Sequence, residues 1–341
     1  MERVGNIKLN KIKIAGIGSY TPARIMTNFD FEKIVDTSDE WITSRTGIKK
    51  RHFAGENEAS SDFAVQASIN ALKDAKVEPK DIDLVVLGTA TPDMLFPSTA
   101  CIVADKVGCI NATAFDVSAG CSGFIYSLSI AMQYLRTGYY KNALVIGTET
   151  LSKILDFSDR ETCVLFGDGA GAMVIKSEVS DDEKDAIVAI MTGSDGSGAG
   201  KLLLPAGGSR IPASIQTVKN HLHYVHMEGR DIFKFAVRIS DIVVDTLLKD
   251  ANLKIDSIDH YLFHQANVRI IDSAIKRLNV PEEKVIMTID EYGNTSSASI
   301  PMSLSISVSS GRIKKDDLIL IAVFGAGLTW GGAILRWNKD D

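Results

Sequence analysis

The sequence contains few residues of the kinds that bind metals. Its 341 residues include four cysteines and six histidines, and the cysteines form no C-x-x-C pair with histidines clustered beside it. This pattern argues against a zinc site, and in a reducing compartment a disulfide framework is not expected either. We therefore expect no metal, and we expect three of the four cysteines to be ordinary core thiols.

The sequence also lacks a hydrophobic run of membrane-spanning length. Its first residues, MERVGNIKLNKIKIAGIG, carry too much charge for the apolar core of a signal peptide. Lysine and arginine number 37 against 43 aspartates and glutamates, and the formal net charge of −6 does not suggest a nucleic-acid partner. We expect a cytoplasmic protein with neither a membrane nor a nucleic-acid partner.

Short apolar segments alternate with amphipathic ones along the chain. Several of the former are continuously apolar, as expected for strands buried on both faces. We predict strands over 11–20, 83–90, 112–119, 142–150, 171–176, 186–193, 260–266, 285–290, 318–325 and 333–338. Helices are predicted over 60–77, 229–253 and 268–278, and directly after Cys121. This alternation is typical of an α/β fold.

The chain repeats itself at an offset of 176 residues. LKDAKVEPKDIDLVVLG begins at Leu72 and LKDANLKIDSIDHYLFH begins at Leu248. A second pair follows in the same order, CSGFIYSLSIAMQYLRTGYYKNALVIG and NTSSASIPMSLSISVSSGRIKKDDLILIAVFG, each giving a helix, a glycine and a strand. We predict two duplicated halves, 1–180 and 181–341, and a long loop region over 193–222.

The duplication places three polar residues at helix starts or strand ends. It puts Cys121 and Asn294 at equivalent helix starts, and it puts His264 where the first half has Gly88, just after a strand. Because open α/β sheets bind ligands beyond the carboxyl ends of their strands, we expect these side chains to converge on one site.

Cys121 lies in DVSAGCSGF, among small residues and directly before an apolar helix. The N–H groups and dipole of a helix start favour an anion, so we predict a lowered thiol pKa. The glycines allow the sharp strand-to-helix turn of a nucleophile elbow. Free cysteine is also among the most buried residue types, so this stretch alone leaves nucleophile and core thiol equally open.

Three further motifs are candidates for the site. His264 lies in LFHQAN and Asn294 in EYGNTSSASIP, although a lone histidine is often structural and an asparagine there is also a good helix N-cap. In VFGAGLTWGG a strand runs into glycines, where backbone N–H groups can bind an oxyanion, with a simple turn as the alternative. FGDGAGAMVIK lacks the helix that a dinucleotide loop requires, and we interpret it as a tight turn.

Together and in this order, these motifs resemble those of the β-ketoacyl-acyl carrier protein synthase III family, the initiating condensing enzymes of type II fatty acid synthesis. TNFDFEKIVDTSDEWITSRTGIKKRH and FSDRETCVLFGDGAGA add to the resemblance, which runs from about residue 11 to 338 and is weakest over 181–222. It implies a thiolase-like five-layer αβαβα fold made of two duplicated halves, a homodimer, and Cys121, His264 and Asn294 as catalytic residues.

The resemblance also implies binding residues. The oxyanion would be held by the backbone N–H groups of Cys121 and Ala326. The residues implied for coenzyme A and its phosphopantetheine arm are Thr37, Trp41, Arg45, Arg160, Gly229, Ala266 and Asn267. Those implied for the carrier protein, including a basic patch, are Lys234, Gln265, Ala266, Asn267, Val268, Arg269, Lys276 and Arg277. The acyl pocket would comprise Phe96, from the neighbouring subunit, with Leu165, Phe166, Met227 and Phe324.

The implied reaction is a decarboxylating Claisen condensation of a short acyl-CoA, acetyl-CoA above all, with malonyl-acyl carrier protein through an acyl-Cys121 intermediate, without a cofactor. A degradative thiolase would carry a second cysteine after Cys163, and a hydroxymethylglutaryl-CoA synthase would use a glutamate that these motifs lack. A starter-unit condensing or acyl-transferring enzyme of polyketide or other secondary metabolism stays open, as does a non-catalytic acyl-CoA-binding protein, against which the intact Cys, His and Asn set argues.

Overall fold

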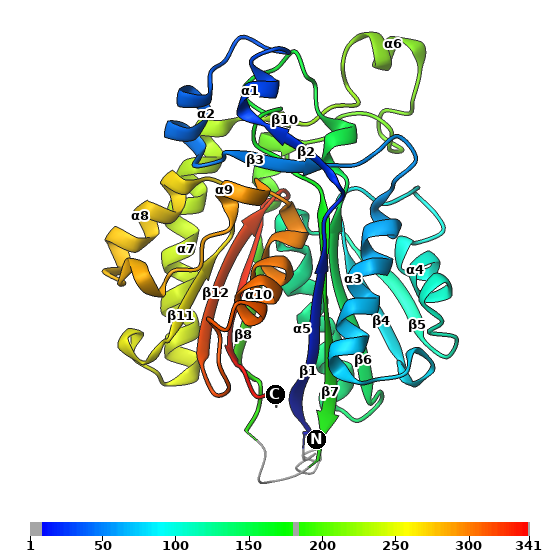
Figure 1. Ribbon diagram of the computed structural model, residues 1–341, viewed down its shortest axis with the longest axis vertical. Helices are drawn as coiled ribbons and strands as arrows, with labels where there is room; N and C mark the ends of the chain where they lie inside the picture. The colour runs from blue at the N-terminus through cyan, green and yellow to red at the C-terminus, as the bar shows by residue number, and fades with distance from the viewer. Residues whose placement is uncertain (1–8, 180–183, 340–341) are drawn as a thin grey trace.

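Two β-sheets with helices between and outside them make up the computed structural model, which describes residues 9–179 and 184–339 (Figure 1). The first sheet has the order β1-β7-β6-β4-β5, with β1 (Lys11–Tyr20), β4 (Leu84–Gly88), β5 (Thr113–Val117), β6 (Asn142–Glu149) and β7 (Gly169–Glu178). The second has the order β11-β12-β13-β8, with β8 (Ile187–Ser194), β11 (His260–Phe263), β12 (Leu318–Gly325) and β13 (Thr329–Arg336).

Parallel strands form the part of each sheet that leads to the site. β4 pairs in parallel with both β5 and β6, and β11 pairs in parallel with β12. β4 reads LVVLG and is buried throughout, as a strand covered on both faces requires. Since parallel strands end at the same edge of a sheet, the residues that follow β4, β6, β11 and β12 lie along one edge of each sheet.

The two sheets and three layers of helices make five layers. The central layer holds α5 (Gly123–Arg136) and α10 (Ser299–Ser309). The outer layers hold α3 (Ser60–Ala75) and α4 (Thr99–Val107) on the first sheet, and α7 (Gly229–Ala251) and α8 (Val268–Leu278) on the second (Figure 1). The prediction of an αβαβα fold with two duplicated halves is confirmed.

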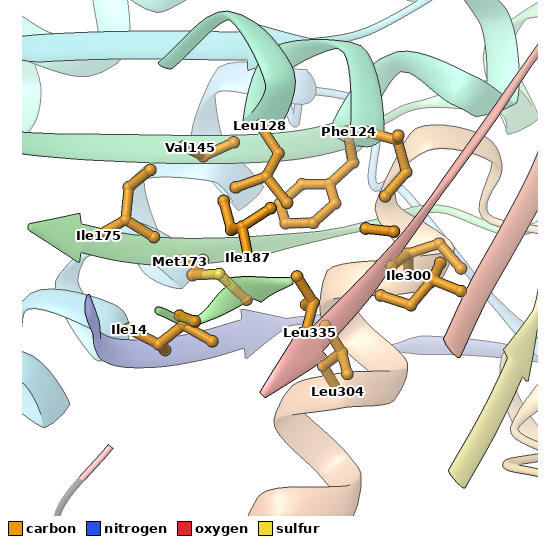
Figure 2. Packing of buried hydrophobic residues seen from close by; sticks show 14 of the residues in the cluster. Ile14, Phe124, Leu128, Val145, Met173, Ile175, Ile187, Ile300, Leu304 and Leu335 are labelled. Carbon is orange, nitrogen blue, oxygen red and sulfur yellow. The ribbon is translucent and has the colours of Figure 1, made fainter. Parts of the chain in front are cut away.

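The largest hydrophobic cluster lies between the two sheets. Phe124 and Leu128 of α5 and Ile300 and Leu304 of α10 pack there against side chains from both sheets (Figure 2). The apolar positions of α5 recur at helical spacing, so one stripe of the helix is buried on the strands. This packing places the starts of both central helices between the sheet edges.

Smaller elements cover that edge. They are β2 (Arg24–Thr27), α1 (Asn28–Phe31), α2 (Asp39–Thr46), β3 (Lys50–Phe53), β9 (Leu202–Leu203), α6 (Ile215–Lys219), β10 (His226–Met227) and α9 (Ile289–Tyr292), with 3₁₀ helices at Gly120–Ser122 (η2), Leu151–Ile154, Gly196–Lys201 and Ser296–Ala298 (η7). The 3₁₀ helices at Pro79–Asp81, Ile255–Ser257 and Glu282–Lys284 precede β4, β11 and Val285, at the other end of the sheets. The predicted loop region 193–222 therefore contains short ordered elements. Among the described residues, no helix combines the length and the apolar character needed to cross a membrane.

Two sequence predictions about elements are wrong. The strand expected over 285–290 is reduced to one parallel bridge between Tyr261 and Val285, because the chain then turns into α9. The last strand begins at Thr329 and includes the glycines of TWGG, rather than beginning at Ala333.

The equivalence of Cys121 and Asn294 is also wrong. Cys121 is the middle residue of η2, and the middle residue of η7, 176 positions later, is Ser297. Asn294 lies three residues earlier, in the loop before η7. The match of Gly88 with His264 holds, because each comes at the carboxyl end of a strand that pairs in parallel with its neighbour.

Truncating Leu128 tests the role of the central cluster. This side chain is fully buried, so Leu128→Ala is expected to lower the free energy of unfolding by about 2–5 kcal/mol. Ile69→Ala, on the exposed side of α3, is the control and is expected to change it by about 0.5 kcal/mol or less. Urea denaturation followed by circular dichroism at one protein concentration measures both; equal effects of the two variants would contradict the assignment of the core.

Candidate active site

Cys121 lies at the inner end of a cavity of about 260 Å³. It is in η2, which leads directly into α5, and only 8% of the residue is exposed. Gly120 before it has φ +51°, a conformation that residues with a Cβ rarely adopt. The local turn therefore presents the thiol to the cavity at the start of a central helix.

The loop after β12 closes on this turn from the second half. A Cβ placed on Gly325 would come within 2.5 Å of the Cys121 backbone nitrogen, and one on Gly120 within 2.7 Å of the Ala326 nitrogen. Only glycines allow these two segments to approach so closely. The backbone nitrogens of Cys121 and Ala326 are thereby brought together beside the thiol, as an oxyanion site requires.

His264 follows β11 and lines the same cavity. It is 1% exposed, its Nδ1 and the Ser299 hydroxyl share a hydrogen bond of 3.0 Å, and its ring meets Phe324 edge-on. Burial lowers the pKa of His264 to about 3. The imidazole is therefore neutral at physiological pH and has Nε2 available for hydrogen bonding.

Asn294 is held through its backbone and its side-chain oxygen. Its N–H donates to the Leu165 carbonyl at 2.9 Å, and the Gly167 N–H donates to its carbonyl at 3.0 Å. Its Oδ1 accepts from the Ser296 N–H at 2.9 Å. Because the oxygen is occupied, the NH₂ group is left to donate into the cavity, which Asn294 also lines.

The predicted lowering of the Cys121 pKa is wrong. Burial raises the pKa of this thiol to about 12; a hydrogen bond from the Ser296 hydroxyl opposes the rise, and the charge of Glu149 adds to it. The desolvation of a thiolate in this enclosed position outweighs the favourable helix start that the sequence indicated. The resting side chain is a neutral thiol that must lose its proton when it attacks.

The cavity thus combines a buried thiol and two neutral side-chain donors, with the Cys121 and Ala326 backbone nitrogens close to its wall at Gly325. A thiol can form a thioester with an acyl group. The donors can stabilise negative charge that develops on oxygen, and they do so best where water is excluded. This arrangement suits acyl transfer followed by a step that forms an enolate.

Aromatic and cationic side chains surround the cavity mouth. The Arg45 and Arg160 guanidinium carbons lie 4.8 and 5.1 Å from the centre of the Trp41 ring, and Trp41 and Arg45 line the cavity. Arg160 donates to the Asp36 carbonyl at 2.9 Å. The Thr37 hydroxyl is buried and has no hydrogen-bond partner among the described residues. The residues predicted to bind coenzyme A thus gather here.

Other predicted residues fall into two groups. Those that line the cavity are Leu165, Phe166, Met227, Gly229, Ala266, Asn267, Arg269 and Phe324. Those outside its lining are Phe96, Lys234, Val268 and Lys276, of which Phe96 is 84% exposed.

One predicted carrier-protein contact is wrong. Gln265 is fully buried, and its side chain donates to the Phe263 carbonyl and accepts from the Thr288 N–H, so it cannot reach a protein surface. Arg277 forms an ion pair with Asp241 on α7 while its side chain stays 51% exposed, and its contact with the carrier protein stays a prediction. The burial of Gln265 follows from these backbone partners, which the motif alone does not reveal.

Sequence reasoning missed several residues that support the site. Ser296 and Ser299 hold Asn294 and His264, but the motif TSSASIP was read only as small residues. Arg51 is fully buried and donates to the Val164 carbonyl, next to the loop that pairs with Asn294. Glu149, the last residue of β6, is fully buried beside Ser297. For Glu149, the one signal available in the sequence is a charged residue at the end of a continuously apolar strand.

Two family models match the chain. One is described as 3-oxoacyl-[acyl-carrier-protein (ACP)] synthase III and matches residues 115–196; the other, described as the C terminal part of the same enzyme, matches residues 248–337. The chain is 53% identical over 326 residues to the β-ketoacyl-[acyl-carrier-protein] synthase III of Caldanaerobacter subterraneus, covering 96% of this chain and 98% of the relative.

Two solved structures are similar to this chain over nearly its whole length. The crystal structure of 3-oxoacyl-[acyl-carrier-protein] synthase III from Aquifex aeolicus matches with a TM-score of 0.87 and 46% identity, over 95% of this chain and 99% of that one. The priming β-ketosynthase from the R1128 polyketide biosynthetic pathway matches with a TM-score of 0.89 and 35% identity, over 98% of each chain.

The raised pKa of Cys121 predicts how its reactivity depends on pH. Below a pKa of about 12 the thiolate fraction rises with pH, so the rate of alkylation by iodoacetamide is expected to increase about tenfold per pH unit, without a plateau below about pH 10. Mass spectrometry of the Cys121 peptide measures the rate, with the exposed Cys101 as the internal control. A plateau near neutral pH would show that the helix start outweighs burial.

Proposed function

The chain belongs to the β-ketoacyl-[acyl-carrier-protein] synthase III family, and on that premise we propose that it condenses an acyl group from acyl-CoA with malonyl-acyl carrier protein, releasing CO₂ and starting fatty acid synthesis. The observation that carries this proposal is one cavity lined by Cys121, His264 and Asn294. The proposal assigns this set to a reaction in two halves.

In the first half, Cys121 takes the acyl group. Its sulfur loses its proton and attacks the thioester carbonyl, and the tetrahedral oxygen accepts hydrogen bonds from the Cys121 and Ala326 N–H groups. The bond from the carbonyl carbon to the coenzyme A sulfur then breaks, and coenzyme A leaves as a thiol with the proton that Cys121 gave up. Exchanging one thioester for another is nearly thermoneutral, so the acyl-enzyme persists until the second substrate arrives.

In the second half, malonyl-acyl carrier protein loses CO₂. The electrons of the broken C–C bond move toward the thioester oxygen, which accepts hydrogen bonds from His264 Nε2–H and the Asn294 NH₂. For His264 to carry its proton on Nε2, the Ser299 hydroxyl donates to Nδ1. Each donor is worth about 3–4 kcal/mol in the transition state. The carbanion then attacks the acyl carbonyl, and the bond from that carbon to the Cys121 sulfur breaks to release the 3-oxoacyl product. The sulfur takes up a proton from solvent, which restores the neutral thiol.

Both substrates arrive as thioesters on a phosphopantetheine arm, so we propose that the reaction needs no cofactor or metal. Trp41 with Arg45 and Arg160 offers a flat aromatic face and two guanidinium groups at the cavity mouth, which suits the adenine and phosphates of coenzyme A. The phosphopantetheine arm would run past Gly229, Ala266 and Asn267 to Cys121.

The acyl group is proposed to be short, acetyl above all. Leu165, Phe166, Met227 and Phe324 line the cavity of about 260 Å³ and would enclose the acyl group with large side chains. Phe96 of a second copy would add to this wall in a homodimer. Leu95 and Phe96 are 79% and 84% exposed beside the edge strand β5, which favours burial between copies; a monomer in sedimentation velocity would contradict this.

Of two other predictions, the polyketide alternative loses support and the cytoplasmic location stays open. A starter-unit enzyme of polyketide metabolism is not favoured, because the fatty-acid relatives described above share more sequence with this chain. The cytoplasmic location stays a prediction, and the free thiols of all four cysteines are compatible with it.

The proposal predicts which half-reaction each residue serves. After mixing with acetyl-CoA, mass spectrometry is expected to find one acetyl group on Cys121, which malonyl-acyl carrier protein removes as CO₂ is released. His264→Ala and Asn294→Ala are expected to keep the adduct but to slow decarboxylation by about 10²- to 10³-fold each, because each removes one donor to the enolate.

Cys121→Ser is the control and is expected to give no stable adduct under the same conditions. An adduct that only another acceptor thiol clears would point to a transferase and overturn the condensing reaction. Faster loading from medium-length or branched acyl-CoA than from acetyl-CoA would overturn the short acyl group while leaving the reaction type intact.

The exposed cations beside the cavity predict a carrier-protein surface. Arg269 lines the cavity mouth on α8, and Lys234 and Lys276 are exposed on α7 and α8. Arg269→Glu is expected to raise the KM for malonyl-acyl carrier protein by about tenfold or more while leaving acetyl loading unchanged, since carrier proteins are acidic. Steady-state kinetics measures both, and equal loss of both half-reactions would contradict the assignment.

A further inference from the structure

Glu149 is a buried carboxylate that joins the two halves beneath the site. It ends β6 and is fully buried. From the first half, the Thr91 hydroxyl donates to its Oε2 at 2.6 Å and the Ala90 N–H lies 3.1 Å from each oxygen. From the second half, the Ser297 hydroxyl lies 2.8 Å from Glu149 Oε1 and 2.8 Å from the Gly88 carbonyl oxygen, so it donates to either of these two acceptors. Among the described residues it has no ion-pair partner, so hydrogen bonds alone compensate its burial.

The internal duplication makes this contact the counterpart of the contact between Gly325 and Cys121. At the offset of 176 residues, Glu149 corresponds to Gly325 and Ser297 corresponds to Cys121. In the catalytic contact, Gly325 leaves the Cys121 N–H beside open cavity. In the other contact, Glu149 Oε1 lies 3.4 Å from the Ser297 nitrogen. The second contact therefore has a carboxylate against the backbone at the position where the first has a glycine.

Ser297 belongs to the short segment that orients both side-chain donors. Directly before it, the Ser296 N–H fixes the Asn294 oxygen at 2.9 Å. Two residues after it, the Ser299 hydroxyl shares the 3.0 Å hydrogen bond with His264 Nδ1. The positions of both donors thus depend on where η7 and the first turn of α10 are held, and Glu149 is the carboxylate that holds them.

We propose that Glu149 is a positioning residue for the decarboxylation half-reaction, acting through Ser297 on the Asn294 and His264 donors. The inference rests on the proposed function. Acyl loading uses Cys121 and the Cys121 and Ala326 N–H groups, whose backbone belongs to η2 and to the end of β12. The link from Glu149 to this group is the weaker one, through the Ser296 hydroxyl that reaches the Cys121 sulfur and through the Glu149 charge. Loss of Glu149 therefore affects the two half-reactions unequally.

The experiment measures each half-reaction in Glu149→Ala, Glu149→Gln and Ser297→Ala. Glu149→Ala is expected to slow malonyl decarboxylation on pre-acetylated enzyme by about 10- to 100-fold, as small misplacement of catalytic donors does, while the acetylation rate and the KM for malonyl-acyl carrier protein change by about threefold or less. Ser297→Ala is expected to show the same selective loss. Glu149→Gln keeps an acceptor for the Ser297 hydroxyl and is expected to restore most of the rate.

Asp83→Asn is the matched control. Asp83 accepts from the Lys141 and Asn142 N–H groups at the other end of β6, so this variant tests loss of a strand-end carboxylate far from the donors. It is expected to leave the ratio of the two half-reaction rates unchanged, whatever it does to the melting temperature.

Two results would overturn the inference: parallel loss of both half-reactions in Glu149→Ala in step with its melting temperature, or an unchanged decarboxylation rate. A Glu149→Gln variant as slow as Glu149→Ala would also count against positioning by hydrogen bonding. Failure of the proposed function would look different, because the unmodified enzyme would then form no acetyl-Cys121 or fail to clear it with malonyl-acyl carrier protein.

Discussion

The close approach of the two halves at the starts of the central helices is the constraint on which the site depends. Gly325 lies against the backbone of Cys121, and Gly147 of β6 lies so close to Ser297 that a Cβ there would come within 2.2 Å of its carbonyl oxygen. No larger residue fits at either place. Each half therefore supplies a helix start that the other half encloses, and the cavity residues Cys121, His264 and Asn294 come from both.

Cys121 and His264 are neutral at this junction. Burial raises the pKa of the Cys121 thiol to about 12 and lowers that of His264 to about 3, so neither carries charge in the resting site. In the proposed reaction, charge develops on the Cys121 sulfur and then on oxygen atoms that would face donors already in place. Such preorganisation is the most effective form of electrostatic catalysis, and the hydrogen bonds from Ser296 and Ser299 maintain it.

Much of the architecture could be predicted from the sequence, because it depends on patterns that the chain itself displays. The 176-residue repeat and the apolar strands identified two α/β halves, and the placement of His264 after a strand put it in the same cavity as Cys121 and Asn294. Depth of burial could not be predicted, and it decided the thiol pKa against the helix start. The inward turn of Gln265 and the loss of the strand over 285–290 likewise depend on neighbours distant in the chain.

The backbone pairing of Phe166 with Asn294 has a consequence for how such enzymes diversify. Phe166 lines the cavity, and the segment around it is hydrogen-bonded on both sides to the residue that carries the amide donor. A backbone shift at Leu165, Phe166 or Gly167 that accompanies a change of the acyl pocket would also move Asn294. Selection for a new substrate range would therefore act more freely at Met227, which lines the cavity and lies outside this backbone pairing.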